Sequence, residues 1–458
     1  MKRKIILCIL SLCILITPIS AFAYEIDASS ISDSLYNTGQ IAEKPKITLE
    51  YDKAAQNKNE NAPETGCKAV YIADPVSGKV FYEKNAHKKM YPASTTNILT
   101  ALVVLENCKV DEKATVSRRA INLIPEGYSN AKLVAGEKLS VYTLLEALLI
   151  PSANEAANVL AEHVSGSVEK FAKLCNKRAK ELGCEKLHFV NPNGIHNAQH
   201  YCTAYDLYLV AKECKKYEAF NKIVTTQSFT IPPDKFYTKN DRTFQNRNEL
   251  IIHGARHYYP YCNGIKTGHT DAAGQCLVSS ATKDNLDLIC VVLGGHKIRG
   301  INQRFSDSKK LFQFVYDNYS YKLITNKNEP VKQLKIENAT GDTAALDVII
   351  QEDIRAVVPK GFDADKIEAQ VNLKEDIKAP LKENEVVGSV SYKIDGLTYS
   401  TNLVASHDVK KQPYWILNIL VAIIAISFVV FVIMMIDIAI RKRKYKKEIK
   451  KKKNYTNE

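Results

Sequence analysis

Tyr91-Pro92-Ala93-Ser94-Thr95-Thr96-Asn97 is the stretch of sequence that decides the fold. Proline is tolerated in the first turn of a helix, so Pro92 favours a helical run from about Ser94 through Leu105. Positions i and i+3 lie on one face of a helix, so the side chains of Ser94 and Asn97 are expected to share a face. The free backbone N–H groups at such a helix start could also bind a negatively charged oxygen near Ser94.

Three further stretches follow along the chain, and each contains polar residues next to apolar ones. They are Ile150-Pro151-Ser152-Ala153-Asn154-Glu155-Ala156-Ala157, Phe189-Val190-Asn191-Pro192-Asn193-Gly194-Ile195-His196 and Asn263-Gly264-Ile265-Lys266-Thr267-Gly268-His269-Thr270. A single short motif is weak evidence, because Ser-x-x-Lys alone also occurs at 167–170, 280–283 and 306–309. The order, spacing and flanking residues of the four stretches together support the interpretation given below.

The pattern of apolar residues predicts an α+β fold. Short strands are predicted at 69–73 and 79–82, helices at 142–149 and 155–164, and buried strands at 277–281 and 286–293. Strands early and late with helices between them favour a sheet in which the two ends of the domain meet. After about Tyr321 the chain alternates apolar and polar residues in short runs separated by turn signals such as Asp395-Gly396. This alternation predicts a small all-β domain over residues 323–408.

The N-terminus has the three parts of a secretory signal over residues 1–23. Lys2, Arg3 and Lys4 form the charged part, an apolar run follows, and Ala21-Phe22-Ala23 is a small-x-small cleavage site. We expect the mature chain to start near Tyr24; an uncleaved anchor is the alternative. Residues 24–62 are polar and are predicted to be a flexible lead-in.

Residues 414–440 are predicted to form one transmembrane helix. The run from Trp415 to Ile440 is apolar except for Asn418, Ser427 and Asp437. At 1.5 Å per residue it spans about 39 Å, enough to cross a hydrocarbon core of roughly 30 Å. The basic tail at 441–458 follows at once, which predicts a cytoplasmic C-terminus and folded domains outside the cell membrane.

The net charge of +13 lies mainly at the two termini. Ten Lys or Arg against two Glu give the tail +8, and the first four residues carry +3, which leaves +2 for the rest. This distribution reflects membrane topology, so we expect no nucleic-acid partner for the folded part.

Nine cysteines remain beyond the signal segment. The number is odd and no Cys-x-x-Cys pair exists, so neither a zinc site nor a complete disulfide framework is predicted. Most are expected to be small buried residues, although Cys175 and Cys184 could form a bridge. No metal and no cofactor are predicted.

The four stretches resemble the motifs of the serine-type D-alanyl-D-alanine carboxypeptidases, the low-molecular-mass penicillin-binding proteins. That family carries S-x-x-K, S-x-N and K-T-G in this order. Here the motifs are represented by Ser94 to Asn97, Ser152 to Asn154 and Lys266 to Gly268. The resemblance covers about residues 65–320, and weakly the β domain that follows. It implies a penicillin-binding/β-lactamase-like transpeptidase fold over residues 63–322.

The resemblance also assigns a role to each motif residue. A serine hydroxyl is a weak nucleophile and needs a neighbouring base. Ser94 would be the nucleophile, with Ser152 as proton relay to the leaving amine and Asn154 as a hydrogen-bonding brace. On an edge strand, Lys266 and Thr267 would bind the terminal carboxylate of the substrate, and Gly268 would let the substrate backbone approach closely. The backbone N–H of His269 would be the second oxyanion donor.

Each of these residues also has a purely structural interpretation. Ser152 could be a helix cap after Pro151, and Lys266 a surface lysine on a hairpin. His196 and the Asn-Pro-Asn-Gly turn are interpreted as structural, and the side chain of His269 as part of the rim. The joint occurrence of the motifs in order favours the functional interpretation for Ser152 and Lys266.

Position 97 departs from the family pattern, because Asn97 stands where the family has lysine. A carboxamide cannot take up a proton at neutral pH. Three interpretations stay open. The chain is a weakened or inactive homologue that still holds peptide; Lys266 or a bound water partly replaces the base; or a lysine at position 97 was changed, since the two codons differ by one base.

The resemblance implies cleavage of the last D-alanine from peptidoglycan stem peptides that end in D-Ala-D-Ala, through a Ser94 acyl-enzyme. β-Lactam antibiotics would then be acylating ligands. The alternative is an inactive homologue that binds stem peptides or a cell-wall partner. A β-lactamase is disfavoured by the transmembrane helix, the β domain and the sequence around Ser152.

Overall fold

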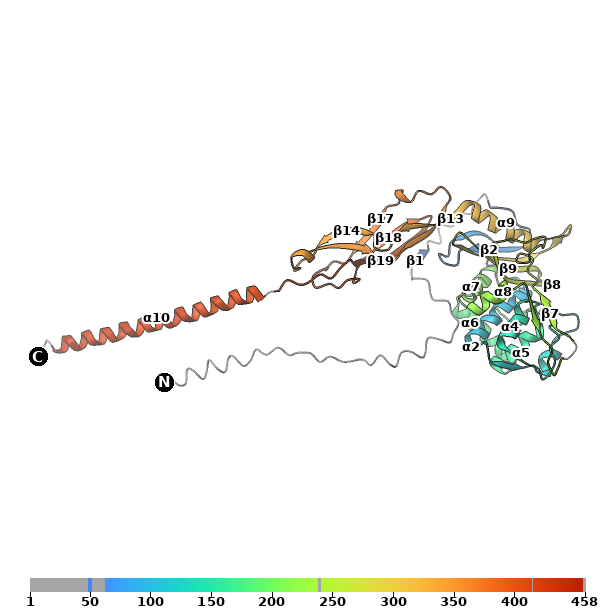
Figure 1. The fold of residues 1–458 in the computed structure, drawn as a ribbon, viewed down its shortest axis with the longest axis horizontal. Helices are drawn as coiled ribbons and strands as arrows, with labels where there is room; N and C mark the ends of the chain where they lie inside the picture. The colour runs from blue at the N-terminus through green and yellow to red at the C-terminus, as the bar shows by residue number, and fades with distance from the viewer. Residues whose placement is uncertain (1–47, 52–61, 238–239, 414, 456–458) are drawn as a thin grey trace.

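The computed structural model describes residues 48–51, 62–237, 240–413 and 415–455. The predicted signal segment and its cleavage site lie outside the described residues. Figure 1 shows a mixed helix-and-sheet domain at one end of the molecule, a smaller β domain beside it, and one long helix that leads away from the β domain. The α+β class and the two-domain order predicted from the sequence are confirmed.

A five-stranded antiparallel sheet organises the mixed domain, with strand order β3-β2-β10-β9-β8. The strands are β2 (Ala69–Ala73), β3 (Val80–Lys84), β8 (Cys262–Thr270), β9 (Gly274–Lys283) and β10 (Leu286–Gly295). Pairing of β2 with β10 brings the early and late strands together, as expected. Among the described strands, β8 pairs only with β9, so the strand that carries the Lys266 motif lies at an edge.

Both faces of this sheet are covered, which explains why β10 is apolar from Leu288 to Leu293. Ile289, Val291 and Leu293 face the core shared with the helices that include α7 (Ala204–Cys214). Cys290 and Val292 face the opposite core, which is covered by α9 (Gln303–Asn318).

Between β3 and β8 the chain forms a layer of helices. Its longer members are α2 (Asn97–Asn107), α4 (Val141–Leu149), α5 (Asn154–Ser165), α6 (Val168–Glu181) and α8 (Glu218–Thr225). Shorter elements are η3 (Ala93–Thr96), β4 (Lys113–Thr115), α3 (Arg118–Asn122), β5 (Lys138–Ser140), β6 (Ser228–Ile231), β7 (Arg242–Gln245), β11 (Lys297–Ile298) and β12 (Ile301–Asn302). Helix α2 contacts α4, α5, α6 and α7 and is the central helix of this layer.

The β domain contains the strands β13 to β19 and has its own apolar core. The strands are β13 (Tyr319–Thr325), β14 (Pro330–Lys335), β15 (Ala345–Ile350), β16 (Ile354–Pro359), β17 (Ala369–Leu373), β18 (Val386–Ile394) and β19 (Leu397–Ala405). Its larger sheet has the order β14-β15-β19-β18-β17, and β13 pairs with β16. Part of the lead-in, predicted to be flexible, forms β1 (Thr48–Tyr51), which adds to β19.

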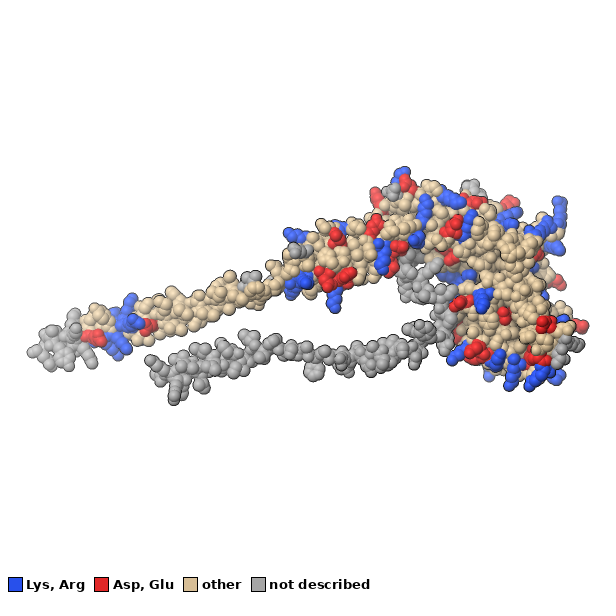
Figure 2. Space-filling model, in the orientation of Figure 1, with Lys and Arg blue, Asp and Glu red and all other residues tan. Residues whose placement is uncertain are grey.

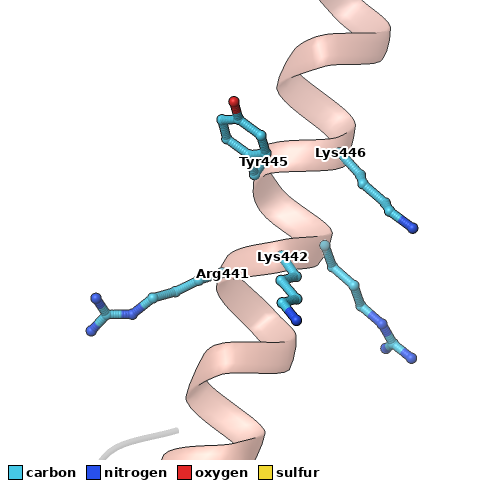
Figure 3. Close-up of a pocket in the computed structure, with 5 residues that line it drawn as sticks. Arg441, Lys442, Tyr445 and Lys446 are labelled. Carbon is cyan, nitrogen blue, oxygen red and sulfur yellow. The ribbon is translucent and has the colours of Figure 1, made fainter.

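Helix α10 (Trp415–Tyr455) is long and apolar enough to cross a membrane and is the one described helix that meets this test. In Figure 2 its first part shows no charged side chains, and lysines and arginines gather near its far end. Figure 3 shows that Arg441 and Lys446 point to different sides of the helix, with Tyr445 between them along the chain. The hollow between these side chains is lined by one helix alone, and it offers no set of groups for catalysis.

Candidate active site

Ser94 lies in the turn η3, which leads directly into α2. The turn is anchored because Thr95 donates both its backbone N–H and its hydroxyl to the carbonyl of Pro92, at 3.3 and 2.7 Å. Ser94 is partly exposed, whereas Thr95, Thr96 and Asn97 are buried. Within the described part of the chain, the hydroxyl of Ser94 makes no hydrogen bond. The predicted helical start at Ser94 is therefore present, with a 3₁₀ turn at its beginning.

The Asn97 side chain is fully buried and its orientation is fixed by its partners. Its amide nitrogen donates to the carbonyl oxygen of Leu148 at 3.0 Å and to the hydroxyl oxygen of Ser152 at 3.3 Å. A carbonyl can only accept, so the NH₂ group faces Leu148 and the amide oxygen faces away. That oxygen, Oδ1, has no hydrogen-bond partner within the described residues. Position 97 thus contacts Ser152 through a donor that cannot act as a base.

Ser152 and Asn154 lie where α4 ends and α5 begins. Ser152 is buried with φ 68°, a left-handed conformation that costs a non-glycine residue about 1–3 kcal/mol and often marks functional sites. Asn154 donates through its backbone and side chain to the carbonyl of Ser129, at 3.0 and 2.8 Å. The next residue, Glu155, accepts from the backbone N–H of Ala131 at 2.6 Å. Asn154 and Glu155 together hold the loop before β5 against the start of α5.

Lys266 is buried on the edge strand β8, and its amine donates to the carbonyl of Thr267 at 3.1 Å. Burial lowers the pKa of Lys266 well below its usual range, and the nearby positive charges of Arg247 and Arg304 lower it further. Thr267 is also buried, and His269 is exposed at the end of the motif. The surface-lysine interpretation of Lys266 is therefore wrong.

Strand β8 lies directly against the turn that carries Ser94. A Cβ placed on Gly268 would come within 2.8 Å of the Pro92 oxygen and within 3.1 Å of the backbone nitrogens of Ser94 and Thr95. No side chain fits there, since contacts of this length to backbone require the backbone to move. The structure thus brings the first, second and last motifs together around the serine turn: Asn97 contacts Ser152, and Gly268 contacts Ser94.

A buried histidine supports the serine turn and was not predicted from the sequence. His200 Nδ1 accepts the backbone N–H of Val190 at 3.2 Å, so Nε2 carries the proton and donates to the Thr96 hydroxyl at 2.8 Å. Thr96 in turn donates to the carbonyl of Ala93 at 2.8 Å. The pKa of His200 is lowered to about 3, mainly by burial and to a smaller extent by repulsion from His188 and His196. The ring is neutral and orients Thr96, two residues after Ser94.

The third motif also supports this turn, as predicted. A Cβ on Gly194, which has φ 81°, would lie 1.9 Å from the Ala93 oxygen, so the turn at 191–194 packs directly on the serine turn. Thr100 of α2 donates to the carbonyl of Pro192 at 2.6 Å. His196 is exposed and packs edge-on against Tyr91, a structural position.

Two arginines near Lys266 were missed in the sequence. Arg304 donates to the carbonyl of Gly268 at 3.1 Å, and burial lowers its pKa to about 10. Burial also lowers the pKa of Arg247, and the positive charge of each arginine acts on Lys266. No acidic group is among the causes of the Lys266 shift. Two arginines therefore add positive charge beside Lys266, which favours binding of a carboxylate there.

Two family models match the chain, and together they extend from the lead-in to the end of the β domain. Residues 56–297 match the model described as D-alanyl-D-alanine carboxypeptidase, and residues 319–411 match the C-terminal domain of penicillin-binding protein 5. The first match covers more than half of the chain. The chain belongs to the D-alanyl-D-alanine carboxypeptidase family. The family recognised from the four motifs is thereby confirmed.

Relatives of this family match across both folded domains. D-alanyl-D-alanine carboxypeptidase DacF of Bacillus subtilis (strain 168) is 32% identical over 355 residues, 76% of this chain and 87% of that protein. DacA of Escherichia coli (strain K12) is 29% identical, over 73% and 81% of the two chains. The crystal structure of penicillin-binding protein 5 from Haemophilus influenzae is 28% identical, with a TM-score of 0.60, over 77% and 99%. The penicillin-binding fold followed by an all-β domain is thus confirmed.

Proposed function

We propose that this carboxypeptidase-family protein binds peptidoglycan stem peptides ending in D-Ala-D-Ala and forms a Ser94 acyl-enzyme slowly. The observation that carries the proposal is the position of Asn97. Its amide donates to Ser152 and Leu148, in the place where the family chemistry needs a proton acceptor. The contact of Asn97 with Ser152 and the close approach of Gly268 to the serine turn support the proposal.

The terminal carboxylate of the peptide would bind beside Lys266, where Arg247 and Arg304 supply positive charge. Its backbone would lie along the open edge of β8, where Gly268 leaves no side chain in the way. β-Lactams carry a carboxylate and an acylating carbonyl, so they would occupy the same cleft. Thr267 would contribute a hydroxyl to the same carboxylate.

The acylation step would form a bond between Ser94 Oγ and the peptide carbonyl carbon, and the hydroxyl proton of Ser94 would pass to the neutral amine of Lys266. The oxyanion would accept from the backbone N–H groups of Ser94 and His269, which lie on the two elements that Gly268 brings together. The bond from this carbon to the nitrogen of the last D-alanine then breaks, and Ser152 passes a proton to the leaving amine. Water hydrolyses the acyl-enzyme and regenerates Ser94.

The first proton transfer is the step that Asn97 impairs. Removing a general base typically slows a reaction by about 10² to 10⁴. Lys266 is the group best suited to replace it in part, since burial favours its neutral amine. The arginines beside it can hold the substrate carboxylate when Lys266 is uncharged.

A second candidate function is peptide binding without turnover. Asn97 also supports this function, because its donor bond to Ser152 stabilises the arrangement of the site without providing a base. In this case the cleft would hold a stem peptide or a cell-wall partner and leave it intact. A β-lactamase is the less favoured function, since the chain carries the β domain and α10 beyond the mixed domain.

We further propose that α10 anchors the protein in the cell membrane, with the folded domains outside and the basic tail at 441–458 in the cytoplasm. The apolar length of α10 and the positive charge at its far end support this topology. Residues 1–23 would be the removed signal, 24–62 the lead-in, 63–322 the catalytic domain, 323–408 the β domain and 414–440 the membrane span.

The test is release of D-alanine from a synthetic peptide ending in D-Ala-D-Ala, measured beside binding of the same peptide. We expect peptide binding with slow release, and no release from Ser94→Ala. Asn97→Lys is expected to increase the release rate by about 10² or more. If the peptide binds but neither the natural chain nor Asn97→Lys releases D-alanine, the binding function is correct and the enzymatic proposal fails.

A further inference from the structure

Three side chains that commonly bind metal ions lie together outside the active site: Cys108, Glu112 and His163. One ligand atom from each lies within 4.8 Å of the others. Nε2 of His163 is 3.3 Å from Oε2 of Glu112. Two ligands on a tetrahedral zinc ion, with bonds of about 2.0–2.1 Å, are roughly 3.3 Å apart. The imidazole and the carboxylate therefore already have the separation that a shared zinc ion requires.

The local backbone holds these side chains in place. Cys108 ends α2, and its N–H donates to the carbonyl of Val104 at 2.9 Å. Glu112 follows in a tight turn in which its Oε1 accepts the backbone N–H of Lys109 at 2.7 Å. One carboxylate oxygen is thus fixed by the backbone, and the other faces His163 in the last turn of α5. Such outer hydrogen bonds are typical of carboxylates that bind metals.

We propose that Cys108, Glu112 and His163 bind a zinc ion that joins the C-terminal ends of α2 and α5. The donor set decides the metal class: thiolate and imidazole favour zinc, whereas magnesium and calcium prefer oxygen ligands alone. Three protein ligands leave a fourth position for water. An ordinary His163–Glu112 ion pair explains two of the side chains but does not account for the sulfur of Cys108 lying within 4.8 Å of both ligand atoms.

The site connects to the active site through the two helices. Helix α2 begins at Asn97 and α5 begins at Asn154, so both helices start at the active-site motifs and end at the proposed zinc site. At 1.5 Å per residue, these helices separate the two sites by roughly 16–18 Å. The zinc is therefore too far away to take part in the reaction at Ser94, and it holds α2 and α5 in the relative position that sets the contact between Asn97 and Ser152.

Zinc binding must release the thiol proton. Burial and the negative charge of Glu112 raise the pKa of Cys108 to about 11, so the thiol is protonated in the metal-free protein. The sequence predicted no metal site, because Cys108 and Glu112 do not form a Cys-x-x-Cys-type pattern and His163 lies 51 residues after Glu112. The fold alone brings the three together.

The test uses the untagged full-length protein in detergent, stripped of metal with EDTA and titrated with Zn²⁺ by calorimetry. We expect one zinc per chain and a higher melting temperature on binding. Cys108→Ser and His163→Gln should each weaken zinc binding by at least about 100-fold. Cys184→Ser, a change at another partly buried free cysteine, should leave zinc binding unaltered.

A second measurement identifies the sulfur ligand directly. Co²⁺ in place of zinc should give a thiolate-to-cobalt charge-transfer absorption in the natural chain and in Cys184→Ser, and none in Cys108→Ser. The proposal is overturned if the natural chain binds zinc no more tightly than Cys108→Ser, or if its cobalt form lacks this absorption. Neither outcome depends on D-alanine release, so the zinc site and the proposed reaction are tested separately.

Discussion

At position 97 the side chain is held by an acceptor that cannot donate, the carbonyl of Leu148. This bond directs the NH₂ group toward Ser152 and leaves the amide oxygen buried without a partner among the described residues. A buried polar atom without a partner typically costs about 1–3 kcal/mol. Asparagine is therefore tolerated in this place rather than favoured by it, and a side chain with a basic amine would suit the acceptor oxygens of Leu148 and Ser152 better.

Another single residue, His200, should make the free energy of unfolding depend on pH. An unfolded histidine takes up a proton near pH 6.5, whereas burial lowers the pKa of His200 to about 3 in the folded protein. Between these values the unfolded state binds the extra proton. The free energy of unfolding should therefore fall as the pH falls, by up to about 1.4 kcal/mol per pH unit.

Urea unfolding of the natural chain and His200→Gln at several pH values between 6.5 and 4 measures this effect. Glutamine can still donate to Thr96 but does not titrate, so the variant should show a shallower dependence on pH. Equal slopes for both proteins would show that His200 is not the group responsible.

Several residues of the site could not be found from the sequence because their partners are distant along the chain. His200 contacts Thr96 across 104 residues, and Arg304 contacts Gly268 across 36. The spacing of residues within a short motif does not indicate contacts with residues so far away in the sequence. Ser152 and Lys266 could be selected because each lies within a recognisable motif, and the structure places both in the interior beside the serine turn.

At the scale of elements, the contact between β8 and η3 sets the geometry around Ser94. Gly268→Ala would place a methyl group against the backbone of Pro92, Ser94 and Thr95. The strand or the turn must move by a few tenths of an ångström or more, and a misplacement of about 1 Å can cost 10²-fold in rate. We expect loss of fluorescent-penicillin labelling with a destabilisation of about 1–3 kcal/mol.

Gly78→Ala is the control for this substitution. It imposes backbone strain at φ 73° in a turn where nothing lies within 4 Å of the added methyl group. It should lower the melting temperature and leave the labelling rate per folded molecule unchanged. Normal labelling by Gly268→Ala would mean that the close approach of β8 to Ser94 is unimportant for acylation.

Elements with a strong apolar pattern were predicted well, and those that depend on a partner were not. The run at 286–293 is apolar except for Asp287 because both faces of β10 are covered, so it was recognised as a buried strand. Strand β1 was missed because it exists only through pairing with β19, some 350 residues away. Helix α10 continues beyond the predicted span into the basic tail, where apolar periodicity no longer marks its end.

At the scale of the whole molecule, the β domain lies between the mixed domain and α10 (Figure 1). The two domains contact each other at the turn before β3. Lys79 forms an ion pair with Asp395 of the β18–β19 turn, and Phe81 packs edge-on against Tyr319. These contacts join the mixed domain to the β domain, and α10 extends from the far side of the β domain (Figure 1).

A chain that stops after Pro413 tests the role of α10. The apolar side chains of α10 are exposed along its length, and within the described residues no other element covers them. The full-length protein should therefore need detergent, and the shortened chain should remain in the aqueous fraction with unchanged peptide binding. A shortened chain that still sediments with membranes would show that another segment provides the attachment.

The most direct test of the account is the rate of Ser94 acylation by fluorescent penicillin, measured for the natural chain and Asn97→Lys. If Asn97 removes the base while the rest of the site is intact, Asn97→Lys should acylate about 10² to 10⁴ times faster, and Ser94→Ala should abolish labelling in both backgrounds. A natural chain that already acylates as fast as Asn97→Lys would contradict the central claim, because Asn97 would then not limit the reaction.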